Sequence, residues 1–284
     1  MIYLLLAALG LIGAALTIAY SADRGPLVVF FVVAFAVISI ADWIAYGWFD
    51  LFSYHPGLLV DPLADSSLGE FLADIFYVPC LCVVLVRYLP GLPGILTGSL
   101  TVTLLERLFL HLGVFSHHGW ENWHTLAAFI VFYATIDLLW FDLRRGTIPH
   151  ANLLALVRFC LVLDIVGEWG LFIRGSQLAV TRLHLGHSYA ADLAIVNLLT
   201  YGLITVPLGF WALCAVGRTR WQRIGLVALC GTLVKLVMRD LGWQQFVSPM
   251  TPVLDGLAQG AAVALAALLE GPLLAAVPGR ERLG

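Results

Sequence analysis

Ionisable side chains lie inside otherwise apolar segments of this 284-residue chain, and several of them have helical spacing. Glu70 and Asp74 are four residues apart, as are Asp164 and Glu168, so each pair would share one face of a helix. Within a lipid bilayer such groups are costly, and they mark either function or specific pairing. Carboxylates that converge from several helices are suited to bind a cation or to carry a proton.

Depth along the apolar segments places most of these charges in one layer, roughly 5–15 Å below the outer membrane surface. The layer, which also contains His111 and Asp240, has eight carboxylates against three Lys or Arg side chains. Ion pairs can neutralise only three of the acids, so the others must be protonated, solvated or bound to a cation. We therefore predict an ion- or substrate-binding site formed by Asp42, Glu70, Asp74, Glu106, Arg107, Asp164, Glu168, Asp192, Lys235 and Arg239. The inner half of the membrane is sparser in charge, with Asp137 and Arg158 as its main members.

A histidine-rich connector, SHHGWENWH (residues 116–124), follows the fourth apolar segment. Glu121 and His124 are three residues apart, and an ExxH pair at the start of a helix can supply two ligands to zinc or iron. A divalent metal ion is the one cofactor that the sequence suggests, with ligands from His117, His118, Glu121 and His124. Two other interpretations remain open: polar residues at the interface beside belt tryptophans, and a pH-sensing or proton-relay role.

The amino-acid composition shows whether this chain folds in water or in a lipid bilayer. Hydrophobic residues make up 61% and charged residues 12% of the sequence, and the mean hydropathy is +0.95. Soluble domains have about 45–50% apolar and about 25% charged residues, so a soluble fold is excluded and a lipid bilayer is the expected partner. The net charge of −3 gives no basic signature, which excludes nucleic acid as a partner. The five cysteines form no CxxC pair and are expected to be small buried residues.

Apolar runs between Pro, Gly and charged residues predict an all-α integral membrane protein of about nine transmembrane helices. Basic residues test this count, because cytoplasmic connectors carry an excess of Lys and Arg. Nine arginines fall in connectors and the tail on one side and two on the other, and this bias alternates correctly across every connector. The chain should therefore be a multi-pass protein of the cell membrane, with its N-terminus outside and its C-terminus in the cytoplasm. The expected spans are 1–20, 27–49, 68–88, 93–112, 123–142, 151–172, 188–214, 222–242 and 254–276.

The chain also shows an internal duplication. Residues 42–47 (DWIAYG) align with residues 164–169 (DIVGEW), and the same offset of 122 places Glu70 on Asp192. Further on, TLLERLFLHLG (103–113) matches TLVKLVMRDLG (232–242) without a gap. Two four-helix units of this kind keep the same orientation, as in the parallel repeats of some transporters. We predict an N-terminal helix (1–25), a first four-helix repeat (26–146) and a second parallel four-helix repeat (147–284).

One stretch of the chain resembles a known family. The segment LERLF (105–109) is followed by GVFSHHGW (113–120), and LGEFLAD (68–74) with Pro79 precedes both. These residues resemble a segment that recurs in a functionally uncharacterised family of small polytopic proteins from spore-forming Gram-positive bacteria. The resemblance covers roughly residues 65–135, the second half of the chain shows no such match, and the family implies no activity.

Three function classes fit these observations. The first is a transporter or channel for a cation or small solute, which would use the outer-leaflet carboxylate layer. The second is a membrane-embedded, metal-dependent enzyme that acts on a lipid or isoprenoid, with the histidine-rich connector holding the metal and Glu70 or Asp74 as general base. The third is a structural or sensory subunit whose charges hold helices together. The sequence leaves open whether the protein is an enzyme, what its ligand is and which oligomer it forms.

Overall fold

A computed structural model describes residues 2–60, 62–175, 179–181, 192, 195–246 and 248–275. The chain divides into two compact units, and each is described by itself. Unit 1 comprises residues 1–42, 51–157 and 272–284, and unit 2 comprises residues 43–50 and 158–271.

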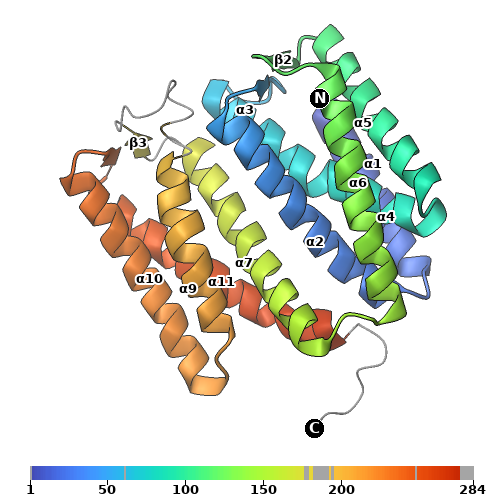
Figure 1. Cartoon of the computed structure of the whole chain (residues 1–284). Coiled ribbons are helices and arrows are strands. Elements are labelled where there is room, and N and C mark those ends of the chain that lie inside the picture. The colour runs from blue at the N-terminus through green and yellow to red at the C-terminus, as the bar shows by residue number, and fades with distance from the viewer. Residues whose placement is uncertain are drawn as a thin grey trace. The chain divides into compact units, whose positions relative to one another are not determined.

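Helices and two short strands make up the first half of the chain (Figure 1). Four of its segments are not α-helical: η1 and η2 are π-helical, and β1 and β2 are strands. In chain order the elements are α1 (Ile2–Tyr20), α2 (Arg24–Asp42), η1 (Trp43–Trp48), β1 (Phe52–Tyr54), α3 (Pro62–Leu72), η2 (Ala73–Tyr77), α4 (Val78–Tyr88), α5 (Leu92–His111), β2 (Phe115–His117) and α6 (Asn122–Arg145).

The second half of the chain has the same kinds of element in a similar order. A helix, a strand, a π-helical segment that runs into a short helix, a long helix, a second strand and a last helix follow one another. They are α7 (His150–Gly175), β3 (Ala179–Thr181), η3 (Leu198–Thr205), α9 (Val206–Leu213), α10 (Gly217–Asp240), β4 (Gln244–Phe246) and α11 (Thr251–Ala275).

Eight helices among the described residues are long and apolar enough to cross a membrane, so the chain is an all-α, multi-pass membrane protein. The predicted span at residues 93–112 is not among these eight. It corresponds to α5, which has 20 residues but carries Glu106 and Arg107 together with several Ser and Thr residues. The count of nine therefore stays a prediction. The eight helices are Ile2–Tyr20, Arg24–Tyr46, Asp65–Tyr88, Asn122–Arg145, His150–Gly167, Ile195–Leu213, Gly217–Asp240 and Thr251–Ala275.

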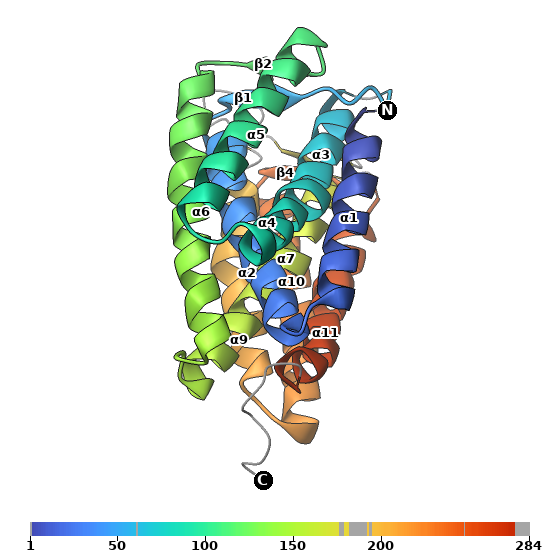
Figure 2. The ribbon, with the colours of Figure 1, turned by 90° about the vertical axis from the view of Figure 1, so that its right-hand side faces the viewer.

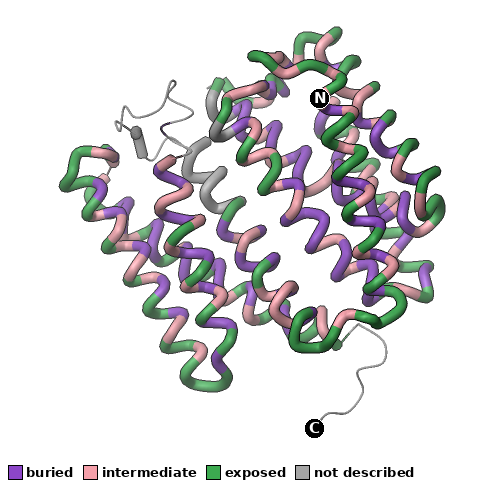
Figure 3. Tube along the Cα trace, in the orientation of Figure 1, coloured by how far each residue is buried: buried purple, intermediate pink, exposed green. Residues whose placement is uncertain are grey.

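Exposed residues recur along several helices (Figure 3), and many of the large ones are leucines. On α5 they recur every fourth residue, which is one stripe along a helix. A stripe of this kind would aggregate in water but is the ordinary surface of a helix in lipid. The exposed leucines of α5 are Leu92, Leu96, Leu100, Leu104 and Leu108.

Two π-helical segments precede prolines. The segment η2 ends two residues before Pro79, and η3 ends two residues before Pro207. Because proline lacks an amide hydrogen and its ring clashes with the carbonyl four residues earlier, the α-helical ladder opens at this point. Both prolines then occupy the first turn of the next helix, where a missing donor costs nothing.

Each half of the chain has one two-stranded antiparallel pairing. In the first, Phe52 faces His117 and Tyr54 faces Phe115; in the second, Ala179 faces Phe246 and Thr181 faces Gln244. The first strand pair closes one end of unit 1, near the start of α1 (Figure 2).

The connector after β1 is fixed by a single carboxylate. Asp65, which is buried, accepts hydrogen bonds from the backbone amides of Gly57, Leu58 and Leu59 at 2.7–2.9 Å. Three donors on one carboxylate hold this turn against the start of α3.

Small residues allow α10 and α11 to pack closely in unit 2. Gly256 and Gly260 are four residues apart on α11, the small-xxx-small spacing of close helix contacts. A Cβ atom added at Gly256 would lie 2.5 Å from the Ala228 carbonyl oxygen, and one added at Gly260 would lie 2.8 Å from the Ala228 Cβ. Neither position has room for a larger side chain.

Gly256→Ala should therefore lower the free energy of unfolding by about 1–3 kcal/mol, the usual range for overpacking. Unfolding of the purified protein in detergent, followed by circular dichroism against temperature or SDS, measures this change. Gly271→Ala is the matched control, because it lies on the same helix with nothing within 4 Å of its added Cβ. Equal stability of both variants would contradict the close contact.

Candidate functional site

In unit 1, Glu106 on α5 is held by donors from β2 and the start of α6. Its Oε1 atom accepts from His117 Nε2 at 3.1 Å and from Asn122 Nδ2 at 2.7 Å, and Oε2 accepts from the Thr125 hydroxyl. Glu106 exposes only 10% of its side chain. These three donors satisfy both oxygens of the Glu106 side chain, which lies in an otherwise apolar helix.

A second group of carboxyls surrounds Tyr54, next to Glu106. The Tyr54 hydroxyl donates to Asp42 Oδ2 at 2.8 Å, and the Asp42 and Asp74 carboxyl groups are close enough to interact. Burial raises the pKa of the Tyr54 phenol well above its ordinary value, and the negative charges of Asp42, Asp74 and Glu70 raise this pKa further. Tyr54 is therefore a fixed hydrogen-bond donor to this group.

A close pair of carboxyl groups such as Asp42 and Asp74 favours one bound proton. An ionised carboxylate only accepts hydrogen bonds, so two carboxyl groups can bond each other only when one of them is protonated. Asp74 is 1% exposed and lies in η2, while Asp42 is the last residue of α2 before η1. Two π-helical segments thus contain or border the pair, and such segments occur frequently at functional sites.

The predicted metal ligands have other partners. His117 binds Glu106, whereas Glu121 and His124 form a capping box at the start of α6. In that box His124 Nδ1 accepts from the Glu121 amide at 2.9 Å, and the Glu121 carboxylate accepts from the Trp123 indole at 2.9 Å. Within the described part of the chain, no group of three or more His, Cys, Asp or Glu side chains is placed to hold a metal ion.

Other predicted residues of the first half lie apart from the carboxyl group. Arg107 and His111 are exposed on α5 and do not neutralise the buried acids. Asp137 on α6 is buried and accepts from the Gly91 amide at 3.0 Å, which fixes the turn between α4 and α5.

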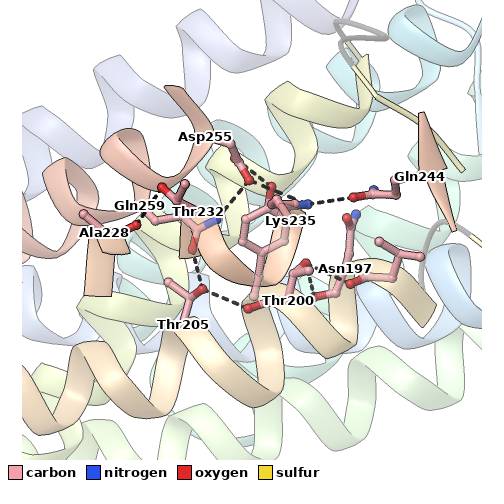
Figure 4. Close-up of polar contacts among 11 residues, drawn as sticks. Asn197, Thr200, Thr205, Ala228, Thr232, Lys235, Gln244, Asp255 and Gln259 are labelled. Carbon is pink, nitrogen blue, oxygen red and sulfur yellow. Dashed lines mark hydrogen bonds and ion pairs between the residues drawn. The ribbon is translucent and has the colours of Figure 1, made fainter. Parts of the chain in front are cut away.

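Unit 2 contains a buried ion pair in a chain of polar contacts (Figure 4). Lys235 on α10 is 1% exposed and extends between Asp255 and Gln244, with its Nζ atom 3.6 Å from Asp255 Oδ2 and 3.5 Å from Gln244 Oε1. The same ammonium group lies 4.7 Å from the centre of the Tyr201 ring, which is a cation–π distance.

The network continues from Asp255 towards η3. Asp255 accepts from the Tyr201 hydroxyl at 3.0 Å and from Gln259 Nε2 at 3.0 Å, and the Thr205 hydroxyl lies 2.6 Å from Gln259 Oε1. Tyr201 and Thr205 are four residues apart on η3, and Asp255 and Gln259 are four apart on α11. Two helical faces therefore meet through paired polar groups around one carboxylate.

The remaining predicted residues of the second half divide by exposure. Asp164 and Asp192 are buried, at 4% and 5% exposure. Arg239 is exposed and pairs with its neighbour Asp240 at 2.8 Å, so it takes no part in the buried network. The side chain of Glu168 lies outside the described residues.

Another buried carboxylate of unit 2, Glu270, is paired with two arginines. Glu270 on α11 receives Arg158 through Nε at 2.8 Å and NH2 at 2.7 Å, and Arg220 NH2 lies 3.2 Å from its other oxygen. Arg220 also donates to the carbonyl oxygens of Leu213 and Ala215, at the end of α9. This clamp joins α7, α10 and α11 by charge.

Comparisons with protein-family models, with curated proteins and with solved structures give no match to this chain. The resemblance of residues 65–135 to a family of spore-forming bacteria therefore stays a prediction.

Sequence reasoning missed Tyr54, Tyr201, Asp255, Gln259 and Glu270. The i, i+4 spacing of Asp255 and Gln259, like that of Tyr201 and Thr205, was a usable signal, because both pairs interrupt apolar helices. Tyr54 gave no signal, since a tyrosine in a connector is ordinary at a membrane surface.

Removing Lys235 should strongly destabilise the protein. Lys235→Met leaves the Asp255 carboxylate buried without its ion-pair partner, which typically costs about 3–5 kcal/mol. The double variant Lys235→Met/Asp255→Asn should regain part of this loss, because a neutral amide oxygen still accepts from Tyr201. SDS-induced unfolding of the purified protein gives the three free energies.

Arg239→Met is the matched control on the same helix. Its ion pair is exposed, so its loss should change the free energy of unfolding by at most about 1 kcal/mol. If Lys235→Met and Arg239→Met cost the same, the buried pair does not stabilise unit 2.

Proposed function

We propose that this chain is a transporter of a cation or small solute that exchanges its ligand for protons at Asp42 and Asp74. The observation that carries the proposal is the close approach of these two carboxyl groups beside Tyr54, because two neighbouring carboxylates repel each other and favour one proton held between them. A cation that binds the pair would release this proton, so binding and protonation are linked. Tyr54 orients Asp42, and Glu70 and Glu106 add negative potential close by.

The position of the pair supports a transport site. Buried ionisable groups in membrane helices mark ion pathways and proton relays. Interrupted helices at such sites are typical of transporters, because the irregular backbone can line a polar cavity. Asp74 lies within η2, directly before the helix that Pro79 begins.

We further propose that the two halves of the chain arose by duplication and form two parallel four-helix repeats after α1. The strand registers support this: adding 127 to the residues of β1 and 129 to those of β2 converts the first pairing into the second. The same offset of 129 converts Glu106 into Lys235 and the start of α6 into the start of α11. The second repeat would thus hold a built-in cation where the first holds a carboxylate.

The contacts of basic residues support the orientation with the N-terminus outside and the C-terminus in the cytoplasm. Arg144 binds Asp23 at 3.2 Å, and Arg87 and Arg24 donate to the Ser21 hydroxyl and carbonyl. These arginines lie at the start of α2 and in the last turns of α4 and α6, so three basic helix ends of unit 1 meet, which agrees with an excess of Lys and Arg on the cytoplasmic side.

Proton exchange in liposomes tests the proposal. Protein is reconstituted into vesicles with an acidic interior and an entrapped pH-sensitive dye, and chloride salts of Na+, K+, Mg2+, Ca2+ and Mn2+ are added outside in turn. At least one salt should raise the internal pH in wild-type vesicles. Asp42→Asn and Asp74→Asn should reduce the rate to that of protein-free vesicles, because an amide cannot exchange the proton.

Asp137→Asn is the matched control, since Asp137 is a buried carboxylate on α6 with a purely local partner, the Gly91 amide. It should keep the wild-type rate. The proposal fails if no salt dissipates the gradient in wild-type vesicles, or if all three Asn variants retain the same rate.

A further inference from the structure

The two faces of the first strand pair differ sharply. Side chains alternate between the faces of a strand, so every second residue points the same way. Phe52, Tyr54 and Phe115 are buried and pack ring against ring at 5.2–5.8 Å between centroids. This aromatic face packs the β1–β2 strand pair against unit 1 and leaves a polar face towards solvent.

The polar face brings two imidazoles to one point. Ser53 and Ser116 are cross-strand partners, and their hydroxyl oxygens lie 2.8 Å apart. His55 Nε2 lies 2.9 Å from the Ser116 hydroxyl oxygen, and His118 Nε2 lies 3.5 Å from the same atom. Both ring nitrogens therefore lie within 3.5 Å of one oxygen atom, although the two histidines are far apart in the sequence.

We propose that His55 and His118 form a binding site for a divalent transition-metal ion on the exposed face of the β1–β2 strand pair. The Nε2 atom of neutral imidazole is a common metal ligand, with a metal–nitrogen distance of about 2.0–2.1 Å for zinc. Both histidines are exposed, so a metal ion can reach them from solvent. The Ser116 hydroxyl and water would complete the coordination.

The chemistry of the donors selects the class of metal. Imidazole nitrogen suits Zn2+, Cu2+, Ni2+ and Fe2+, whereas Mg2+ and Ca2+ prefer carboxylate and carbonyl oxygen. The two imidazoles are the donors proposed for this site, so a preference for these ions over Ca2+ and Mg2+ follows. With only two protein ligands the ion keeps open positions, which suits reversible capture.

The second strand pair provides an internal comparison. At the positions that correspond to Ser53 and Ser116 the chain has Val180 and Gln245, and at those of His55 and His118 it has Arg182 and Val247. Strands β3 and β4 and these four positions contain no histidine, so the proposed pair of imidazoles belongs to the first strand pair. The proposed metal site depends on the β1–β2 strand pair alone. Its test is therefore independent of the test for proton exchange at Asp42 and Asp74.

Metal binding by the full chain tests the inference. The protein is purified in detergent without a polyhistidine tag, stripped with EDTA, desalted and titrated with Zn2+ against a chromophoric chelator. Wild type should bind one Zn2+ per chain. His55→Ala and His118→Ala should each weaken binding at least about tenfold, since changes in outer-shell partners alone cost about 10–100-fold.

His111→Ala is the matched control, because His111 is an exposed histidine on α5 outside the β1–β2 strand pair. It should bind Zn2+ as wild type does, and Ca2+ or Mg2+ in excess should not compete. Electron paramagnetic resonance of the Cu2+-loaded protein should show coupling to imidazole nitrogen that is lost in His55→Ala/His118→Ala. Absence of stoichiometric binding in wild type, or equal affinity in the double variant, would overturn the site.

Discussion

Pro79 and Pro207 each lack the amide hydrogen that a continuous helix needs. Two groups of buried polar side chains lie where the helix is interrupted before these prolines. Opening the ladder before each proline produces the segments η2 and η3. Asp74 lies in the first of these, and Tyr201 and Thr205 lie in the second. In a bilayer the freed backbone groups and the acidic side chains both need polar partners, so the irregular backbone and the buried acids occur together.

The sequence predicted the class of fold well, because hydropathy and arginine placement act over whole helices. Eight of the expected spans reappear as helices of sufficient length. Glu70, Asp74, Asp164 and Asp192 are buried, whereas their common depth in the membrane stays a prediction. The ligand set in the connector shows the limit of spacing arguments. Glu121 and His124 have the i, i+3 spacing of a metal pair, but a helix capping box has the same spacing, and the structure has the box.

Exposure around a helix was the other quantity that sequence could not supply. Arg107 is adjacent to Glu106, and Arg239 is four residues from Lys235, so both arginines seemed able to balance the buried layer. A rotation of about 100° per residue turns Arg107 away from Glu106, and it is exposed while Glu106 is held by three donors. The charge that balances Lys235 instead comes from Asp255, on a different helix.

The β1–β2 pairing acts as a strap. It ties the connector between α2 and α3 to the connector between α5 and α6, and Asp65 fastens the adjoining turn with three amide hydrogen bonds. Two helical hairpins joined in this way at one end cannot separate there without breaking the strand pair. Any rocking within unit 1 must therefore have its pivot at the strap, and the larger displacement must occur at the arginine-bearing ends, where Arg144 and Asp23 form a largely exposed and readily broken contact.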